Sequence, residues 1–395
     1  MKILHTSDWH LGHTLYNYDR SAEQQAVLRQ IEQLVADRQP DLFLLCGDVY
    51  HIAQPSAAAQ QLFIEAMMRI RAAAPEMKIV LLAGNHDSGS RHEIFRSAWE
   101  ELGVTAIGQV NRQEEPDHYI IELPGKGFVV GVPYVHERNL PDDFFPRLLA
   151  RVEERNAAHL PVVLTAHTYV TGSDCTGHED VIGEAVGGIE SWDLSCFGQG
   201  YDYLALGHIH HAQVVRGSEG RARYSGSPLP IHFDERYPHY VLWVELDRQG
   251  DAPRVEEIEM RNPCPLITLP LRGAADWQSV KQCFASFPDE QPGYVRLLVE
   301  VEDFLPPGAN AEAAEIAKGK ACRFCFIQTS RKAKSAQQVG DRTFTTAEIQ
   351  RLSPLDIARL YAEDKGLTFA DDMASLLQEV ITRLRAEERE EPMSE

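Results

Sequence analysis

Residues 78–87 read KIVLLAGNHD, an apolar run that stops at a glycine and is followed by three polar side chains. The apolar part is continuous rather than alternating, which indicates a strand that is buried on both faces of a sheet. Asn85, His86 and Asp87 stand just beyond its carboxyl end. Because ligands of layered α/β proteins gather at the carboxyl ends of strands, this stretch predicts a fold class and the place of a site.

Four other apolar runs end in the same way, each followed by a carboxylate or an imidazole. The runs lie at 2–4, 41–46, 161–166 and 201–206, and the residues that follow them are Asp8 and His10, Asp48, His167, and His208 and His210. Segments 22–37 and 56–73 carry apolar residues at helical spacing. This alternation of strands and helices predicts an α/β fold with a site at the five strand ends.

The rest of the chain indicates further layers and domains. Short β-rich runs at 119–135 and 223–260, separated by glycine and proline, predict hairpins that complete a second sheet. We therefore expect a four-layer α/β/β/α sandwich with a small α+β domain after it. The expected division is a main domain at 1–262, the small capping domain at 263–331, a linker at 332–350 and a C-terminal helical pair at 351–395.

The helical pair can be interpreted in two ways. Ser353 and Pro354 are typical of a helix start, and Gly366 can end that helix. A second helix then carries one apolar stripe, formed by Met373, Leu376, Leu377, Val380, Ile381 and Leu384. Such a stripe either packs on the chain's own domain or forms a docking face for a partner helix.

The composition is that of an ordinary soluble globular protein. The chain has 395 residues, 44% of them hydrophobic and 25% charged. No apolar run approaches the roughly 20 residues of a membrane helix, and residues 1–8 lack the pattern of a secretory signal. Seven cysteines at uneven spacings favour a reducing compartment, and the pair Cys322 and Cys325 is interpreted as buried small residues. We expect a cytoplasmic protein.

The net charge of −21 counts against simple binding of nucleic acid, because an acidic surface repels phosphate. Bound divalent cations would invert the local potential, and a partner subunit could supply a basic surface. The charge therefore leaves DNA possible as a substrate that the chain handles with a partner.

The polar residues at the strand ends suit a metal centre. A mixed set of Asp, His and Asn favours manganese, iron or zinc over calcium. In extended backbone, residues two apart point to the same side, so Asp8 and His10 could act together, as could His208 and His210. The carboxylate of Asp48 could bridge two ions, and Asn85 and His167 would complete the set. Two ions clamp a phosphoryl group and activate water for in-line attack.

Three further residues suit roles around that centre. His86 could protonate the leaving oxygen from outside the ligand set, and Asp87 could fix the tautomer and orientation of His86. His51, near the Asp48 turn, could contact phosphate. A single histidine is more often an ordinary surface or core residue, and this is the interpretation given to His5, His13, His92, His118, His136, His159 and His239.

The motifs in this order resemble the calcineurin-like metallophosphoesterase superfamily, whose members include phosphatases, phosphodiesterases and nucleases. The resemblance implies two metal ions. One would be held by Asp8, His10, Asp48 and His210, and the other by Asp48, Asn85, His167 and His208. It also implies that His86 is the catalytic histidine and that His51 contacts phosphate.

Four stretches further resemble the SbcD family of DNA double-strand-break nucleases, namely residues 3–12, 83–88, 203–210 and 224–228. This resemblance implies a manganese-dependent exonuclease and endonuclease, with Mg²⁺, Fe²⁺ or Zn²⁺ as other possible metals. It implies a coiled-coil ATPase partner similar to SbcC, and a homodimer within a heterotetramer, formed through 56–73 and 93–102. The rival hypotheses are a phosphodiesterase of small or cyclic nucleotides and a binding module without activity.

Overall fold

The computed structural model describes residues 1–111, 116–136, 139–141, 143–177, 191–331 and Met373. By its internal contacts the chain divides into Met1–Ser330 and Arg331–Glu395. The expected linker and, apart from Met373, the expected helical pair lie outside the described residues. No helix in the described part is long and apolar enough to cross a membrane.

The first sheet has six strands, and its four central members include the runs at 2–4, 41–46 and 78–83. In spatial order they are β14 (Arg254–Glu259), β13 (Tyr240–Glu245), β1 (Lys2–Thr6), β4 (Leu42–Cys46), β5 (Lys78–Leu82) and β6 (Val104–Ile107). Strands β1, β4, β5 and β6 are parallel, so their carboxyl ends meet at one edge.

The continuous apolar run in β4 is explained by burial on both faces. Leu42 and Leu44 belong to the core that also contains residues of the second sheet. Phe43 and Leu45 belong to the core beneath the helices. All four side chains are fully buried, which confirms the interpretation of continuous runs as strands in the middle of a layered fold.

The second sheet also has six strands, and the apolar runs at 161–166 and 201–206 form two of them. Its order is β11 (Gln213–Val214), β12 (Ala222–Tyr224), β10 (Tyr203–Gly207), β9 (Val162–His167), β8 (Gly127–Val132) and β7 (Ile120–Leu123). The predicted hairpin at 119–135 is β7 and β8, and it does complete this sheet.

The prediction for 223–260 is wrong in part. Strands β13 and β14 do form a hairpin, but they extend the first sheet rather than the second. The reason is that β13 pairs antiparallel with β1, for example Ile3 with Val244. This pairing joins residues about 240 positions apart and leaves no local pattern in the sequence.

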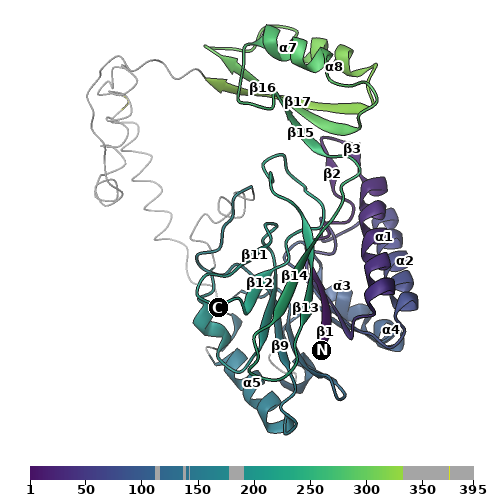
Figure 1. Ribbon diagram of the computed structural model, residues 1–395, viewed down its shortest axis with the longest axis vertical. Helices are drawn as coiled ribbons and strands as arrows, with labels where there is room; N and C mark the ends of the chain where they lie inside the picture. The colour runs from purple at the N-terminus through teal and green to yellow at the C-terminus, as the bar shows by residue number, and fades with distance from the viewer. Residues whose placement is uncertain (112–115, 137–138, 142, 178–190, 332–372, 374–395) are drawn as a thin grey trace. The chain divides into compact units, whose positions relative to one another are not determined.

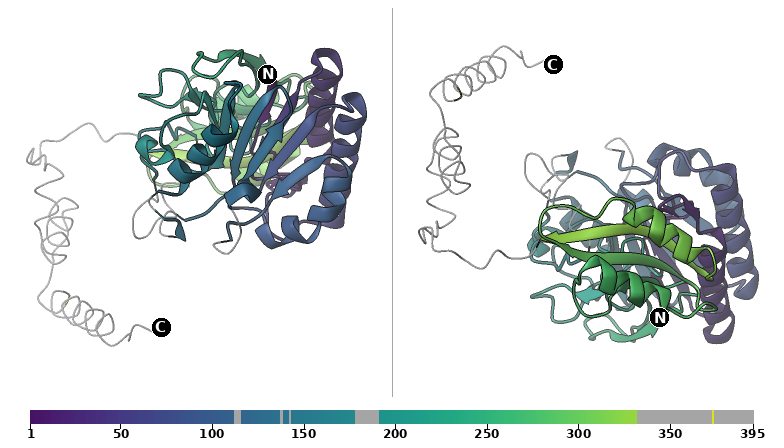
Figure 2. Two further views of the ribbon diagram at one scale, coloured as in Figure 1. Left: turned by 90° about the horizontal axis from the view of Figure 1, so that it is seen from below. Right: turned by 90° about the horizontal axis from the view of Figure 1, so that it is seen from above.

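Helices cover the outer faces of both sheets, so the predicted four-layer α/β/β/α sandwich is confirmed (Figures 1 and 2). Helices α1 (Ser21–Arg38) and α2 (Ala57–Ala73) pack on the first sheet, and α5 (Phe144–Arg155) packs on the second. Shorter elements are β2 (Thr14–Leu15), β3 (Tyr18–Asp19), α3 (Gly89–Ile94), α4 (Arg96–Glu101), η1 (Pro116–Tyr119) and η3 (Leu194–Phe197).

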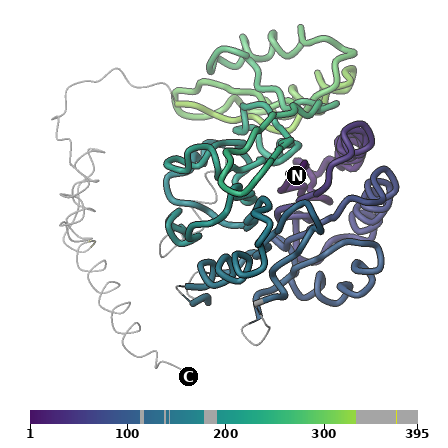
Figure 3. The backbone as a smooth tube through the Cα atoms, turned by 60° about the horizontal axis from the view of Figure 1, so that its bottom comes forward, coloured from purple at the N-terminus to yellow at the C-terminus, as the bar shows by residue number. Residues whose placement is uncertain are grey.

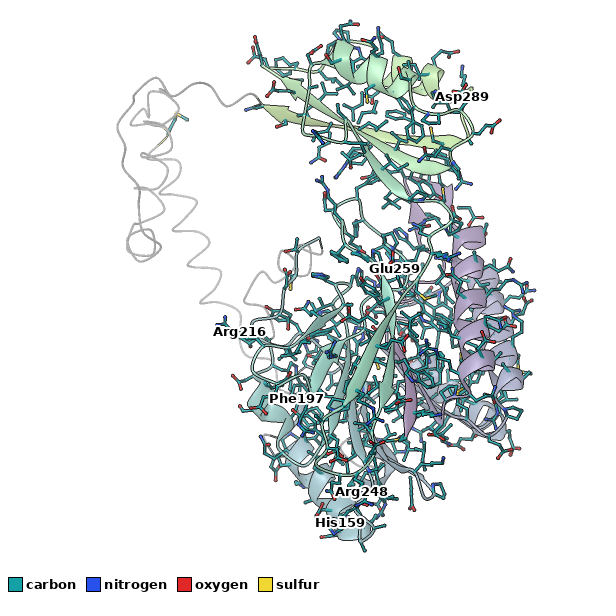
Figure 4. All side chains as sticks on the ribbon, viewed as in Figure 1. His159, Phe197, Arg216, Arg248, Glu259 and Asp289 are labelled. Atoms are coloured by element: carbon teal, nitrogen blue, oxygen red, sulfur yellow. The ribbon has the colours of Figure 1, made fainter. Side chains whose placement is uncertain are left out.

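A small α+β domain follows β14, whose last residue Glu259 is labelled in Figure 4. It contains β15 (Leu266–Leu269), α7 (Trp277–Ala285), β16 (Gly293–Val301), α8 (Ala309–Ala317) and β17 (Cys322–Arg331). Its three strands form their own sheet, and Val280, Phe284 and Val295 lie in its own core. Figure 3 follows the backbone from the purple first strand to this green domain. The boundary at 262/263 stays a prediction.

Candidate metal centre

The loops that follow β1 and β4 run side by side and carry three of the predicted ligands. The N–H of Asp8 donates to the carbonyl of Gly47 at 3.0 Å, and the N–H of His10 donates to that of Asp48 at 3.0 Å. Asp8, His10 and Asp48 have φ of 53°, 44° and 50°. The expectation of extended backbone for Asp8 and His10 is therefore wrong, because the paired loops hold both residues in the left-handed region.

Asp8, His10 and His210 form a first group of possible metal ligands. One ligand atom from each lies within 4.8 Å of the others, and all three residues are buried. The Nε2 atoms of His10 and His210 are 3.0 Å apart. A backbone hydrogen bond from His208 N–H to Asp8 Oδ1, at 3.1 Å, joins the β10 loop to the β1 loop.

Asp48, His167 and His208 form a second group of possible ligands, in which His208 is only partly buried. Asn85 Oδ1 lies between its two imidazoles, 3.0 Å from His167 Nε2 and 2.9 Å from His208 Nδ1. Asp48 Oδ2 lies 3.4 Å from His167 Nε2 and 3.8 Å from His10 Nε2. Asp48 thus stands between the two groups, and all seven predicted ligands come together from two sheets.

Two glycines allow this close approach. A Cβ on Gly84 would lie 2.0 Å from Asp48 Oδ1, and a Cβ on Gly47 would lie 2.2 Å from His167 Nδ1. Gly47 also has φ of +93°, which residues with a side chain rarely adopt. Gly84 and Gly47 are therefore required by the space around the ligands, and Gly47 also by its backbone conformation.

Burial keeps two imidazoles of the site, those of His10 and His51, neutral. Burial lowers the pKa of His10 well below its usual value and lowers the pKa of His51 to about 4. A neutral imidazole keeps the lone pair that a metal ion needs, because a protonated ring cannot act as a ligand. His10, which is one of the predicted ligands, is therefore in the state that suits metal binding at neutral pH.

The carboxylates are buried and need a nearby positive charge. Burial raises the pKa of Asp8 to about 7. Burial opposes ionisation of Asp48 as well, but His167 holds the pKa of Asp48 below its usual range. In return, against the effect of burial, Asp48 raises the pKa of His167 to about 9. Buried carboxylates, an amide oxygen and imidazoles in one place fit a divalent cation that accepts oxygen and nitrogen ligands.

His86 and His51 lie beside the first group. Their rings are stacked, with centroids 5.6 Å apart, and together with His10 they form a third cluster of nitrogen atoms. The Nδ1–H of His86 donates to the carbonyl of His51 at 2.8 Å, and the His86 backbone N–H donates to Asp48 Oδ1 at 2.9 Å. These contacts orient the His86 ring through Nδ1, so that Nε2 is the ring nitrogen on the opposite side from the His51 carbonyl.

Asp87 does not have the predicted role of orienting His86. Its carboxylate accepts three backbone hydrogen bonds at 3.0 Å, from the N–H groups of Val49, Tyr50 and Gly84. It therefore ties the Asp48 loop to the Asn85 loop. The carbonyl of His51 holds His86 in place of Asp87.

The sequence did not point to two residues at this site. Glu235 is fully buried and lies 3.2 Å from His210 Nδ1. Its segment has no strand-end motif, so only the fold brings it there. His13, interpreted as an ordinary histidine, lies against His51 with ring centroids 4.6 Å apart. By contrast, His5 is an ordinary core histidine, bonded to Tyr203 and buried between the sheets.

The chain is similar in sequence to known proteins of one family. Residues 1–212 match the family described as calcineurin-like phosphoesterase. The chain is 33% identical over 302 residues to the SbcD subunit of nuclease SbcCD from Rhodobacter capsulatus, covering 70% of this chain and 73% of that protein. It is 34% identical over 289 residues to the Bacillus subtilis protein of the same name, covering 68% and 71%. For the Escherichia coli K12 protein of that name, identity is 27% over 336 residues, covering 77% and 79%.

Proposed function

The chain belongs to the calcineurin-like phosphoesterases and, among them, to the family of the SbcD subunit of nuclease SbcCD; from this premise we propose that it is a manganese-dependent DNA nuclease. The observation that carries the proposal is the convergence of seven oxygen and nitrogen ligands at one edge of the two sheets. Its activities would be exonuclease cleavage of duplex ends and endonuclease cleavage of single strands or hairpins.

We assign the ligands to two ions, with Mn²⁺ as the proposed metal and Mg²⁺, Fe²⁺ or Zn²⁺ as alternatives. Asp48 would be shared, since its carboxylate is in reach of both groups. The first ion would be held by Asp8, His10, Asp48 and His210, and the second by Asp48, Asn85, His167 and His208. Two such ions supply a clamp for the scissile phosphate and an activated water.

The other residues of the site would handle the substrate. His86 lies against His10, with ring centroids 4.9 Å apart, but is bonded through Nδ1 to a carbonyl. Its Nε2, when protonated, can give a proton to the leaving oxygen. His51 stacks on His86 and is half-buried, so its ring can contact a phosphate oxygen. Asp87 supports the site by joining its two loops.

The names of the relatives support a partner and a role. The SbcD protein is by name one subunit of SbcCD, and we propose that this chain acts on DNA with an SbcC-like coiled-coil ATPase in DNA repair, recombination and replication. Residues 351–395 are the proposed docking segment. A basic surface on the partner would offset the net charge of −21 during DNA binding.

We also propose a homodimer through residues 56–73, which contain α2, and residues 93–102, which contain the end of α3 and all of α4. Ile64 and Met68 on α2 are about half exposed, and so is Phe95 at the end of α3, while Ile94 on α3 is more exposed still. An apolar cavity of about 240 Å³ separates these segments and is lined by Phe63, Ile64, Phe95 and Trp99 among others. Ile64 and Phe95 line this cavity together and are both about half exposed, which supports an interface between subunits at this place.

The test is cleavage of a short end-labelled DNA duplex with added Mn²⁺. The unmodified chain should shorten the duplex, and Asp48→Ala should not, because it removes the shared ligand. Asp37→Ala, at an exposed position on α1, is the matched control and should cleave normally. Full activity of Asp48→Ala would contradict the proposal. Hydrolysis of cyclic nucleotides without cleavage of DNA, even with the ATPase partner, would favour a small-molecule phosphodiesterase.

A further inference from the structure

Glu235 is a buried carboxylate directly behind the metal centre. Its Oε1 accepts hydrogen bonds from the N–H groups of Ile231 at 3.3 Å and His232 at 3.1 Å. The same oxygen lies 3.2 Å from His210 Nδ1. The side chains of Glu235 and His210 are both fully buried, so this contact is shielded from water.

The contact determines which nitrogen of His210 faces the site. Glu235 Oε1 accepts both backbone N–H groups and so presents lone pairs rather than a proton to the ring. A ring nitrogen 3.2 Å from it must donate, so His210 carries its proton on Nδ1. Nε2 then keeps its lone pair, and it is Nε2 that lies 3.0 Å from His10 Nε2 in the first ligand group. Carboxylates behind ligating histidines commonly fix the tautomer and ring orientation in this way.

The segment that carries Glu235 is held by the small domain. Arg296, on β16, donates through Nη1 to Asp234 Oδ1 at 2.8 Å and through Nη2 to the carbonyl of Phe233 at 3.2 Å. Its guanidinium also lies over the Phe233 ring, 5.2 Å from the centroid. The side chain of Arg296 is only 2% exposed, so a charged residue is buried to hold the two residues before Glu235.

We propose that Glu235 is a positioning residue for His210, and that Arg296 of the small domain holds Glu235 in place. The proposal rests on the proposed function, because it takes His210 as a metal ligand. It makes the affinity of one of the two ions depend on a contact made by the small domain. Any movement of that domain that releases Phe233 and Asp234 would weaken the binding of this ion.

The first test compares two nearly isosteric substitutions in the full chain, Glu235→Gln and Glu235→Met. Both side chains suit a buried position, but only Gln keeps an oxygen that accepts from the backbone and from His210 Nδ1. Calorimetric titration of the metal-free protein with Mn²⁺ should show one of two ions bound about 10–100-fold more weakly in Glu235→Met. Glu235→Gln should bind both ions nearly as the unmodified chain does.

A spectroscopic measurement reports on the same metal site and does not depend on nuclease activity. Electron paramagnetic resonance of the Mn²⁺-loaded protein should show a coupled pair of ions in the unmodified chain and in Glu235→Gln. Glu235→Met at limiting Mn²⁺ should show mainly single ions. Equal affinities and equal spectra in all three proteins would overturn the inference. Absence of Mn²⁺ binding by the unmodified chain would instead contradict the proposed function.

The second test separates Arg296 from the small domain as a whole. Arg323 also joins the two domains, since it donates to Glu23 at 3.3 Å and lies over the Tyr18 ring, on the side of α1 rather than of the 233–235 segment. Arg296→Met should weaken the same ion as Glu235→Met, by a smaller factor, and Arg323→Met should leave both ions unchanged. Equal losses in the two arginine variants, or no loss in Arg296→Met, would overturn the role of Arg296.

Discussion

His86 lies beside the proposed ligands, held by a backbone carbonyl, and this separates its role from theirs. We expect His86→Ala to lose DNA cleavage by about 10²–10⁴-fold, the usual contribution of a positioned acid or base, while two Mn²⁺ ions remain bound per chain. The measurements are cleavage rate and metal content after gel filtration. His159→Ala, at an exposed position that bonds Gln249, is the control and should change neither. Loss of metal together with cleavage would show that His86 is a ligand.

Asp87 acts on the structure rather than on the substrate, because its carboxylate accepts three backbone N–H groups from two ligand-bearing loops. Removing it leaves buried donors without an acceptor, so Asp87→Ala should lower the free energy of unfolding by about 3 kcal/mol. Urea unfolding of the metal-free chain measures this loss. Asp193→Ala removes an exposed carboxylate that caps η3 and should cost much less. Equal losses in the two variants would contradict this account.

At the scale of elements, strand β1 carries a buried histidine, His5, that makes the folded chain less stable as the pH falls. Burial lowers the pKa of His5 to about 3 from 6.5, although its Nε2 lies 3.2 Å from the Leu206 carbonyl. Between these pH values the unfolded chain binds a proton at His5 that the folded chain does not. The stability that depends on neutral His5 is therefore fully present above pH 6.5. As the pH drops below 6.5, His5 lowers the free energy of unfolding by about 1.4 kcal/mol per pH unit.

The variant His5→Gln isolates this contribution. It keeps a polar partner for Tyr203 but does not titrate in this range. We expect its unfolding free energy, measured in chelator by urea denaturation, to fall less steeply with pH than that of the unmodified chain. Parallel pH curves for the two proteins would show that His5 does not contribute in this way.

The loops between elements show where local sequence patterns stop being informative. Asp8, His10 and Asp48 adopt positive φ because the β1 and β4 loops are hydrogen-bonded to each other. A non-glycine residue in this region is uncommon, so the local sequence gives no reason to expect it. The spacing of Asp8 and His10 predicted that they act together, and they do lie together, but through a bent loop rather than an extended strand.

At the scale of the whole molecule, partner binding should be separable from the metal centre. The ligands all lie within Met1–Ser330, whereas the proposed docking segment follows in Arg331–Glu395. A chain ending at Ser330 should therefore keep its affinity for Mn²⁺ but lose association with an SbcC-like ATPase, as measured by gel filtration of the mixture. Retained association would place the partner surface on Met1–Ser330.

A matched substitution supports the same test in the full chain. Replacing Leu377 by Asp would interrupt the apolar stripe of the expected second tail helix without removing residues. We expect it to weaken the ATPase complex and to leave metal binding unchanged. If it lowers stability of the isolated chain without affecting the complex, the stripe packs on its own domain.

The sequence by itself determined the layered fold and the seven proposed metal ligands that meet at the site. Continuous apolar runs, such as 41–46 and 78–83, predicted strands buried on both faces, since alternate residues Phe43 and Leu44 enter two different cores. A polar residue at the end of each run then predicted the site, because parallel strands end at a common edge. These features are local, so they can be read from neighbouring residues.

Only the tertiary structure decided which sheet each strand joins and which residues support the proposed ligands. Strand β13 pairs with β1 across about 240 residues, Asp87 bonds the Asp48 loop, and Glu235 reaches His210. A buried carboxylate shows its role only through the donors around it, and those donors come from distant segments. Local patterns report burial and turns, whereas hydrogen-bond partners depend on the packing of the whole chain.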